Sequence, residues 1–266
     1  MGSLARVLAL GALAACDRPH PLVICHNANC TGDTSPANSD TIPGLQAALA
    51  LTNDGRRLVD GVELDFLWDA PRERCAFAHD AETAPARADA SAAVAELRRW
   101  ALFNEGPLIV VIDAKNTGSA DDVPRLAACV ADAGAALAFP VLEGELAFRV
   151  YLSSGDPSLL RAIDERLALL GHTLPLTAGF ASPAPLGNAP PLSDFADIPL
   201  EGISAHPRWL TDQQVRAFDD AGLDLFLWTH ILTTETLDSI DRYEPYAVGT
   251  DDVELLRGWI DGWDPI

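Results

Sequence analysis

Residues 61–80 read Gly-Val-Glu-Leu-Asp-Phe-Leu-Trp-Asp-Ala-Pro-Arg-Glu-Arg-Cys-Ala-Phe-Ala-His-Asp, and the rest of the chain is organised around them. In the first half, three apolar residues alternate with Glu63 and Asp65, which predicts a strand with both carboxylates on one face. Neighbouring acids repel each other and are costly to bury. A carboxylate-bound divalent cation is a common reason to hold such a pair together. The alternative is a polar edge strand with two solvated acids.

Length and composition indicate a globular protein. The chain has 266 residues, enough for one large α/β domain or two small ones. Hydrophobic residues make up 48% and charged residues 21%, which excludes a disordered chain. The net charge of -21 argues against nucleic acid or another extended polyanion as a partner. A phosphate-bearing ligand would therefore need a local cation, and the chain has one lysine, Lys115.

The first 16 residues predict a lipoprotein-type signal peptide. Arg6 supplies the positive charge, and a short apolar run follows from Val7 to Ala15. Leu13-Ala14-Ala15-Cys16 resembles the lipobox of bacterial lipoproteins, in which the cysteine is lipidated. We expect an exported protein anchored to the membrane surface through Cys16, in the periplasm or at the cell surface. An ordinary signal peptide, which would give a secreted protein, is the alternative.

Four further cysteines are compatible with disulfide bonds in an exported protein. They are Cys25, Cys30, Cys75 and Cys129. Four cysteines allow three pairings, and the sequence does not choose among them. A bond between Cys30 and Cys75 is attractive because both are expected in loops that flank the Glu63–Asp65 strand. We assign none of the four as a nucleophile.

Strands and helices alternate along residues 17–266. Apolar stretches predict eight strands, at 22–26, 61–68, 107–115, 148–153, 174–177, 202–206, 223–229 and 247–250. Helical patterns occur at 43–51, 91–103, 120–133, 157–170, 211–221 and 234–240, and the fifth strand is followed by a proline-rich loop through Pro191. This order predicts an α/β fold, a single-domain (β/α)₈ TIM barrel. A doubly wound open sheet is the alternative.

Polar residues gather at the predicted carboxyl ends of these strands, where barrel enzymes place their reactive groups. They are His26, Glu63, Asp65, Asp113, Lys115, Ser153, His206 and Trp228. Asp113 and Lys115 share one face of their strand, so they could also simply neutralise each other. Three carboxylates suit Ca²⁺ or Mg²⁺. A histidine pair suits proton transfer, and a lysine suits charge on a phosphoryl oxygen. Together these groups predict phosphodiester cleavage.

Four short motifs resemble those of the glycerophosphodiester phosphodiesterases, a family of phospholipase-C-like phosphodiesterase barrels. These are His26, Glu63-x-Asp65, His79-Asp80 and Asp113-Ala-Lys115. Further similarity to the family's final strands lies in Ala221-Gly222-Leu223, Leu227-Trp228-Thr229 and Gly249-Thr250-Asp251. The resemblance extends from about Leu22 to Leu256.

The resemblance implies roles for individual residues. His26 and His79 would form the acid–base pair. Glu63, Asp65 and Asp113 would bind one divalent cation, Ca²⁺ or Mg²⁺. In addition, Lys115 would contact the phosphate, and Trp228 would border the substrate head group, where an indole face can hold a choline cation. We expect His79 to face His26 across the metal ligands, and we expect a monomer.

Two departures from the family pattern affect the substrate assignment. The family usually has His-Arg-Gly at the first motif, whereas this chain has His26-Asn27-Ala28, which removes a bidentate phosphate clamp. We assign Asn27 to substrate binding, with Lys115 helping to replace the arginine. The third acid is Asp113 where glutamate is more usual. Together with Asn29, these features resemble the sphingomyelinase D branch, which forms a cyclic phosphate by intramolecular transphosphatidylation.

Two other classes of function remain alternatives. The chain could be a lipid-anchored binding protein on the same barrel, as the missing arginine would allow. It could also be a metal-dependent hydrolase of non-phosphate esters.

Overall fold

Eight parallel strands close into a barrel in the computed structural model, which describes residues 20–30, 38–104, 106–115, 119–139, 146–180 and 192–262. β1 pairs with β11 on one side and with β4 on the other, and this closes the sheet. The (β/α)₈ prediction is confirmed, and the open-sheet alternative is wrong. The barrel strands are β1 (Leu22–Cys25), β4 (Gly61–Asp69), β6 (Leu108–Ala114), β7 (Phe148–Ser154), β8 (Leu176–Phe180), β9 (Leu200–Ala205), β10 (Asp224–Thr229) and β11 (Ala247–Thr250).

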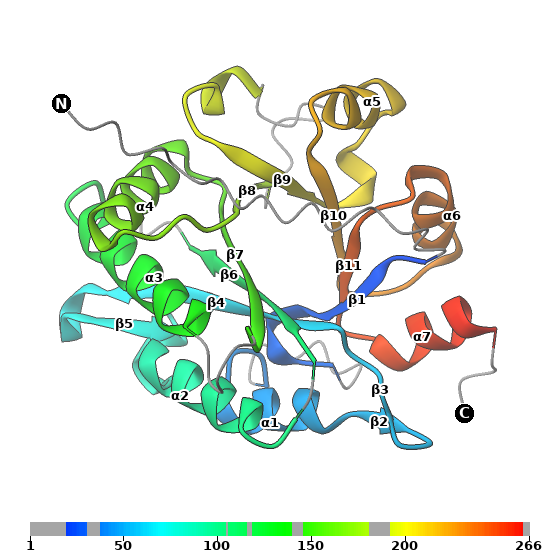
Figure 1. Ribbon diagram of the computed structural model, residues 1–266, viewed down its shortest axis with the longest axis horizontal. Coiled ribbons are helices and arrows are strands. Elements are labelled where there is room, and N and C mark those ends of the chain that lie inside the picture. Colours follow the sequence, from blue (N-terminus) through cyan, green and yellow to red (C-terminus); the bar gives the residue numbers. More distant parts are fainter. Residues whose placement is uncertain are drawn as a thin grey trace, which may run out of the picture.

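Helices surround the barrel (Figure 1). They are α1 (Ile42–Ala50), α2 (Ala90–Ala101), α3 (Val123–Ala138), α4 (Pro157–Leu170), α5 (Asp212–Asp220), α6 (Thr234–Tyr243) and α7 (Val253–Asp261). Among the described residues, no helix is both long and apolar enough to cross a membrane. The proposed leader at 1–16 and most of the proline-rich loop through Pro191 lie outside the described residues.

Several elements differ from the prediction. The loop after β4, expected to be irregular, contains β5 (Arg74–Phe77), which pairs antiparallel with β4. Four residues are too few to show an alternating pattern. A small hairpin of β2 (Thr52–Asn53) and β3 (Arg56–Arg57) was also not predicted. The helical pattern expected after the eighth strand, for which no bounds were predicted, is α7. No α-helix follows β8 within the described residues; a 3₁₀ turn at Leu192–Phe195 does.

Most of the apolar core described lies in two clusters, one between the sheet and the helices and one inside the barrel, and a small third cluster lies beside β5. Ile109, Val111 and Tyr151 belong to the inner part. Because side chains alternate along a strand, Asp113 and Lys115 lie on the same face as Val111. The polar residues at the carboxyl ends of the strands therefore lie directly above the inner apolar core.

Two disulfide bonds join neighbouring segments, Cys25 with Cys30 and Cys75 with Cys129. The expected bond between Cys30 and Cys75 is wrong. After β1 the chain turns back within five residues and brings Cys30 to Cys25. Cys75 lies on β5, which is pinned to β4, and its sulfur meets Cys129 on α3 instead.

Candidate active site

Three carboxylates converge at the carboxyl ends of β4 and β6. Glu63 and Asp65 come from β4 and Asp113 from β6, and Asp65 lies opposite Asp113 in the parallel register. One carboxylate oxygen from each of the three lies within 4.8 Å of the others. The structure therefore brings together the three acids that the sequence assigned to one cation.

Lys115 lies among these acids, inside the barrel mouth as expected. Its Nζ is 2.5 Å from Oδ2 of Asp113 and 3.1 Å from Oδ1 of Asp65, and its side chain is 17% exposed. Burial lowers the pKa of Lys115, but Asp113, Asp65 and Glu63 outweigh burial and hold that pKa well above its ordinary value. The ammonium is therefore a fixed positive charge.

A fourth acid, Asp40, was not predicted. It precedes α1, and its Oδ1 accepts a hydrogen bond of 3.2 Å from the backbone N–H of Asp65. Its Oδ2 is buried and has no hydrogen-bond partner in the described part of the chain. Burial and the charge of Asp65 raise the pKa of Asp40 well above its ordinary value. Asp40 lies in an irregular polar loop, so no periodic pattern marks it in the sequence.

The charge balance of this cluster fits a hard divalent cation. Four acidic side chains face one ammonium, and burial together with Asp65 raises the pKa of Glu63 to about 7, against the opposing effect of His26. Both carboxylate oxygens of Asp65 are buried and make no hydrogen bond within the described residues; one has only the ion-pair contact with Lys115. Carboxylate oxygens crowded in this way are the ligands that Ca²⁺ and Mg²⁺ prefer.

Beside the acids, one carboxylate holds two histidines. His26, directly after β1, has its Nδ1 2.8 Å from Oδ1 of Asp251 and its Nε2 3.8 Å from Oε2 of Glu63. His230, directly after β10, has its Nδ1 3.2 Å from Oδ2 of Asp251. Burial raises the pKa of Asp251, but the hydrogen bonds from His230 and His26 outweigh it and hold that pKa below its ordinary value. Asp251 is thus an anion that accepts from both rings.

The loop that carries His26 has an unusual backbone. Asn27 and Ala28 have φ values of 49° and 51°, in the left-handed region that non-glycine residues seldom occupy. The disulfide between Cys25 and Cys30 encloses both residues and His26. Asn27 is buried, and its side-chain oxygen has no hydrogen-bond partner in the described structure. The loop therefore carries a short, uncharged side chain directly after His26.

His79 lies two residues after β5, on the loop that leaves the β4–β5 hairpin. Its side chain is 54% exposed, and its Nδ1 lies 3.9 Å from Oδ2 of Asp80. Within the described residues, no hydrogen bond or ring contact joins His79 to His26. The neighbouring Ala78 donates its backbone N–H to the carbonyl of Asp65, so the start of this loop is fixed beside the acids.

Aromatic side chains line the opposite side of the barrel mouth. Trp228 stacks parallel to His26 with a centroid distance of 6.0 Å, and it meets His206 and Trp209 edge-on at 5.0 and 5.3 Å. Trp228 therefore lies beside His26 at the barrel mouth. Ser153, another rim residue, is buried on β7.

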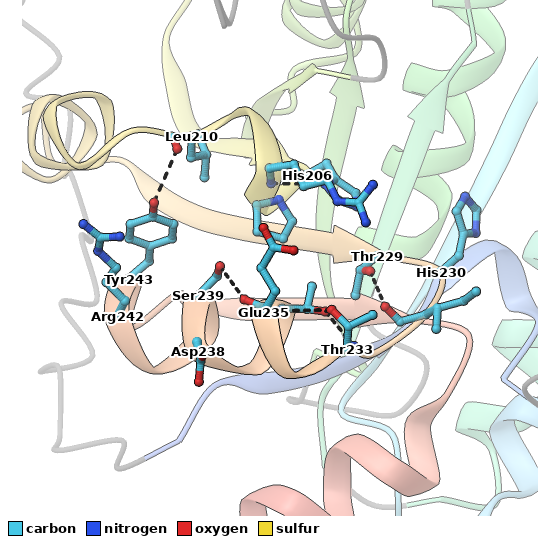
Figure 2. Close-up of a pocket in the computed structure, with 14 residues that line it drawn as sticks. His206, Leu210, Thr229, His230, Thr233, Glu235, Asp238, Ser239, Arg242 and Tyr243 are labelled. Atoms are coloured by element: carbon cyan, nitrogen blue, oxygen red, sulfur yellow. Dashed lines mark hydrogen bonds between the residues drawn. The ribbon is translucent and has the colours of Figure 1, made fainter. Parts of the chain in front are cut away.

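A cavity of about 510 Å³ lies next to this cluster, between the turn after β9 and helix α6. Figure 2 shows Glu235 extending from α6 toward the segment of His206, and His230 at one end of the cavity. Tyr243, at the other end, donates its hydroxyl proton to the carbonyl of Leu210 at 3.4 Å.

Sequence reasoning missed Asp40 and His230, and it quoted Asp251 without giving it a role. His230 is two residues beyond Trp228 and so shares its parity, a signal that the sequence did contain. The pairing of His230 with Asp251 depends on β10 and β11 being neighbours, which the parallel pairing of these two strands shows.

A comparison with solved structures finds that this chain is similar in fold to glycerophosphodiester phosphodiesterases. A Silicibacter pomeroyi protein described as a glycerophosphoryl diester phosphodiesterase is 12% identical, with a TM-score of 0.66, and the match covers 93% of this chain and 96% of that one. An Oleispira antarctica phosphodiesterase, solved with its product sn-glycerol-3-phosphate, is 14% identical, with a TM-score of 0.63 and coverage of 91% and 97%. The glycerophosphodiester phosphodiesterase of Agrobacterium tumefaciens is 13% identical, with a TM-score of 0.56 and coverage of 90% and 99%.

At these identities the comparison establishes the fold, which is the barrel that the sequence resemblance implied. Searches with protein-family models and among curated proteins give no match.

Proposed function

We propose that this protein is a metal-dependent phosphodiesterase that cleaves glycerophosphodiesters or phospholipid head groups. The observation that carries the proposal is the convergence of four acids, the chain's single lysine and an aspartate-bound histidine at one barrel mouth. The shared fold with glycerophosphodiester phosphodiesterases supports it.

Glu63, Asp65 and Asp113 would hold one Ca²⁺ or Mg²⁺ ion, with Asp40 adding negative charge behind Asp65. When bound, such an ion would supply positive charge for a phosphoryl oxygen. It would also balance the excess of carboxylates over ammonium groups, which is costly in a buried site.

Lys115 would hold a second non-bridging phosphoryl oxygen. Its position between Asp113 and Asp65 fixes the ammonium without loss of side-chain entropy during the reaction. This contact would substitute in part for the arginine that the resembling family has where this chain has Asn27, and the amide N–H groups of Asn27 could donate to the substrate.

His26 would transfer a proton at the reacting oxygen. With Nδ1 bound to Asp251, the ring is oriented with its Nε2 toward Glu63 and the acid cluster, where the substrate would bind. The sequence resemblance assigns the second proton transfer to His79. Trp228 would border the head group, because its ring stacks parallel to that of His26.

The fate of the phosphate distinguishes two reactions on this site. Attack by water gives a phosphomonoester, whereas attack by a neighbouring substrate hydroxyl gives the cyclic phosphate of sphingomyelinase D-like enzymes. Asn27 in place of arginine is the observation that keeps the second reaction as a candidate.

The test is an assay on glycerophosphocholine, lysophosphatidylcholine and sphingomyelin, with and without a chelator, followed by ³¹P NMR of the products. We expect chelator-sensitive cleavage of at least one of the three, with a linear or cyclic product that separates the two reactions. A folded protein that binds these molecules without cleaving them would be the lipid-anchored binding protein instead.

We also propose that the protein is exported and anchored through lipidated Cys16. Two disulfide bonds in the described structure support an oxidising compartment, because cytosolic thiols are kept reduced. Labelling with a palmitate analogue, compared between the wild type and Cys16→Ala, tests the anchor.

A further inference from the structure

His230 is bound to the same carboxylate as His26. The two oxygens of Asp251 are divided between the rings, Oδ1 to Nδ1 of His26 at 2.8 Å and Oδ2 to Nδ1 of His230 at 3.2 Å. The rings meet edge to face with centroids 4.7 Å apart. Since each Nδ1 is engaged by Asp251, Nε2 is the nitrogen of each ring that could exchange a proton with a substrate; in His26 it lies 3.8 Å from Glu63.

His230 is half-exposed but is held in place. Its side chain is 52% exposed, and it packs edge-on against Trp228 at 5.9 Å. The hydroxyl of Thr229 donates to the carbonyl of Ile231 at 2.8 Å, which fixes the backbone on both sides of His230. An exposed histidine used only for packing would not need a buried carboxylate as its partner.

His230 also belongs to the wall of the 510 Å³ cavity, together with His206 and Glu235 (Figure 2). His26, by contrast, is buried and lies next to Glu63. The two histidines therefore face different spaces, one beside the acid cluster and one beside a cavity large enough for a small alcohol.

We propose that His230 is a catalytic residue that donates a proton to the leaving oxygen of the substrate, while the leaving alcohol occupies the cavity beside it. The proposal rests on the proposed phosphodiesterase function and adds to it a second proton-transfer residue and a leaving-group subsite.

The step balances in atoms and charge. The oxygen of water bonds to phosphorus and gives one proton to Nε2 of His26. The bond from phosphorus to the alcohol oxygen breaks, its electron pair stays on that oxygen, and Nε2 of His230 supplies the proton. The products are a phosphomonoester and an alcohol.

The shared carboxylate suits this exchange. Before the step His230 carries the positive charge, and afterwards His26 carries it. Asp251 faces one imidazolium and one neutral imidazole at both times, so the net charge around it does not change. The positive charge passes from the half-exposed His230 to the buried His26, where the hydrogen-bonded carboxylate of Asp251 offsets the cost of burying it.

His79 is the competing donor. Its described partner is the half-exposed Asp80 at 3.9 Å, and it has no contact with His26, Trp228 or the cavity among the described residues. The two assignments make opposite predictions for the same experiment.

The experiment compares two substrates with the same glycerophosphoryl group. Glycerophosphocholine expels an alkoxide, which needs a proton, whereas the 4-nitrophenyl ester of glycerol phosphate expels a stable phenolate, which does not. The variants are His230→Gln, His79→Gln and, as the matched control, His172→Gln, whose ring packs on Phe139 outside the site. The ratio of the two rates within one variant is independent of the folded fraction.

We expect His230→Gln to lower turnover of glycerophosphocholine by roughly 10²–10⁴-fold and of the nitrophenyl ester by less than about tenfold. We expect His172→Gln to change neither rate. Equal losses on both substrates for His230→Gln, or a selective loss for His79→Gln alone, would overturn the assignment. A wild-type protein that cleaves neither substrate would overturn the phosphodiesterase function itself, and the proposal with it.

Discussion

His26 and Asp251 are 225 positions apart in the chain, and a buried hydrogen bond of 2.8 Å joins them. Closure of the barrel makes this contact possible, because β1 pairs with β11 and the two residues directly follow those strands. The segments after the first and last barrel strands thus bring a histidine and its carboxylate partner together.

Asp251→Asn should abolish most of the activity and leave the fold intact. Burial lowers the pKa of His26, but Glu63 and Asp251 outweigh burial and raise it, so part of the support for the imidazolium is lost with the carboxylate. Asp251 uses a separate oxygen for the Nδ1 of each histidine, His26 and His230. The asparagine amide has one acceptor oxygen and no negative charge, so it cannot replace both contacts. We expect kcat to fall by roughly 10²–10⁴-fold, measured beside the melting temperature.

Asp197→Asn is the matched control for that variant. Asp197 is exposed and pairs with Arg161 outside the barrel mouth. We expect near-normal turnover for this variant, and an equal loss in both variants would contradict the role of Asp251.

A divalent cation should stabilise the protein against heat. Binding to the folded state alone raises the free energy of unfolding by about 2.7 kcal/mol at a ligand concentration of 100 times Kd. We expect Ca²⁺ or Mg²⁺ to raise Tm for the wild type and to raise it much less for Asp65→Asn, because Asp65 is the fully buried member of the three proposed ligands. Equal cation-induced shifts in the two proteins, read by differential scanning calorimetry, would place the cation elsewhere.

Lys115→Met should depress turnover and, without a cation, stability as well. Loss of the ammonium leaves Asp113 and Asp65 unpaired, which costs about 3–5 kcal/mol when a buried pair is broken. Removing a positive charge does not weaken cation binding electrostatically, so added Ca²⁺ or Mg²⁺ should recover much of the lost stability. Turnover should stay roughly 10²–10³-fold lower because a phosphoryl contact is gone.

A separate result would count against that role for Lys115. If the variant were destabilised and a cation restored both its stability and its full activity, Lys115 would serve only to neutralise the acids. Thermal melts and rates taken on the same samples, with and without cation, distinguish these cases.

The sequence predicted the barrel and its acid cluster because both follow from short-range patterns. Alternation put Glu63 and Asp65 on one face, and parity put Asp113 above the apolar Val111, as found. Asp40 could not be predicted in this way, because its place depends on the return of an irregular loop to the backbone of Asp65.

Contacts between different elements of the fold could not be predicted from the sequence either. The pairing of Cys75 with Cys129 depends on β5, a four-residue strand with no visible period, and on the side of the sheet that α3 covers. His79 was assigned its role by resemblance, and His230 acquires its partner only when β10 and β11 lie side by side.

The two disulfides should separate stability from activity. In the chain-entropy account, the bond of sequence separation 5 between Cys25 and Cys30 contributes about 2 kcal/mol, and the bond of separation 54 between Cys75 and Cys129 about 4 kcal/mol. Cys129→Ala should therefore lower the free energy of unfolding more than Cys30→Ala does.

The smaller disulfide, however, encloses His26 and the two positive-φ residues, Asn27 and Ala28. The backbone strain at each of these two residues costs of order 1–3 kcal/mol and persists only where the surrounding structure is rigid. We expect Cys30→Ala to lose more turnover at a temperature where both variants are folded, because the loop can relax and carry His26 away from Glu63 and Asp251. Urea unfolding curves give the first ranking and steady-state rates give the second. The same order in both measurements would mean that the small disulfide stabilises the chain without positioning the histidine.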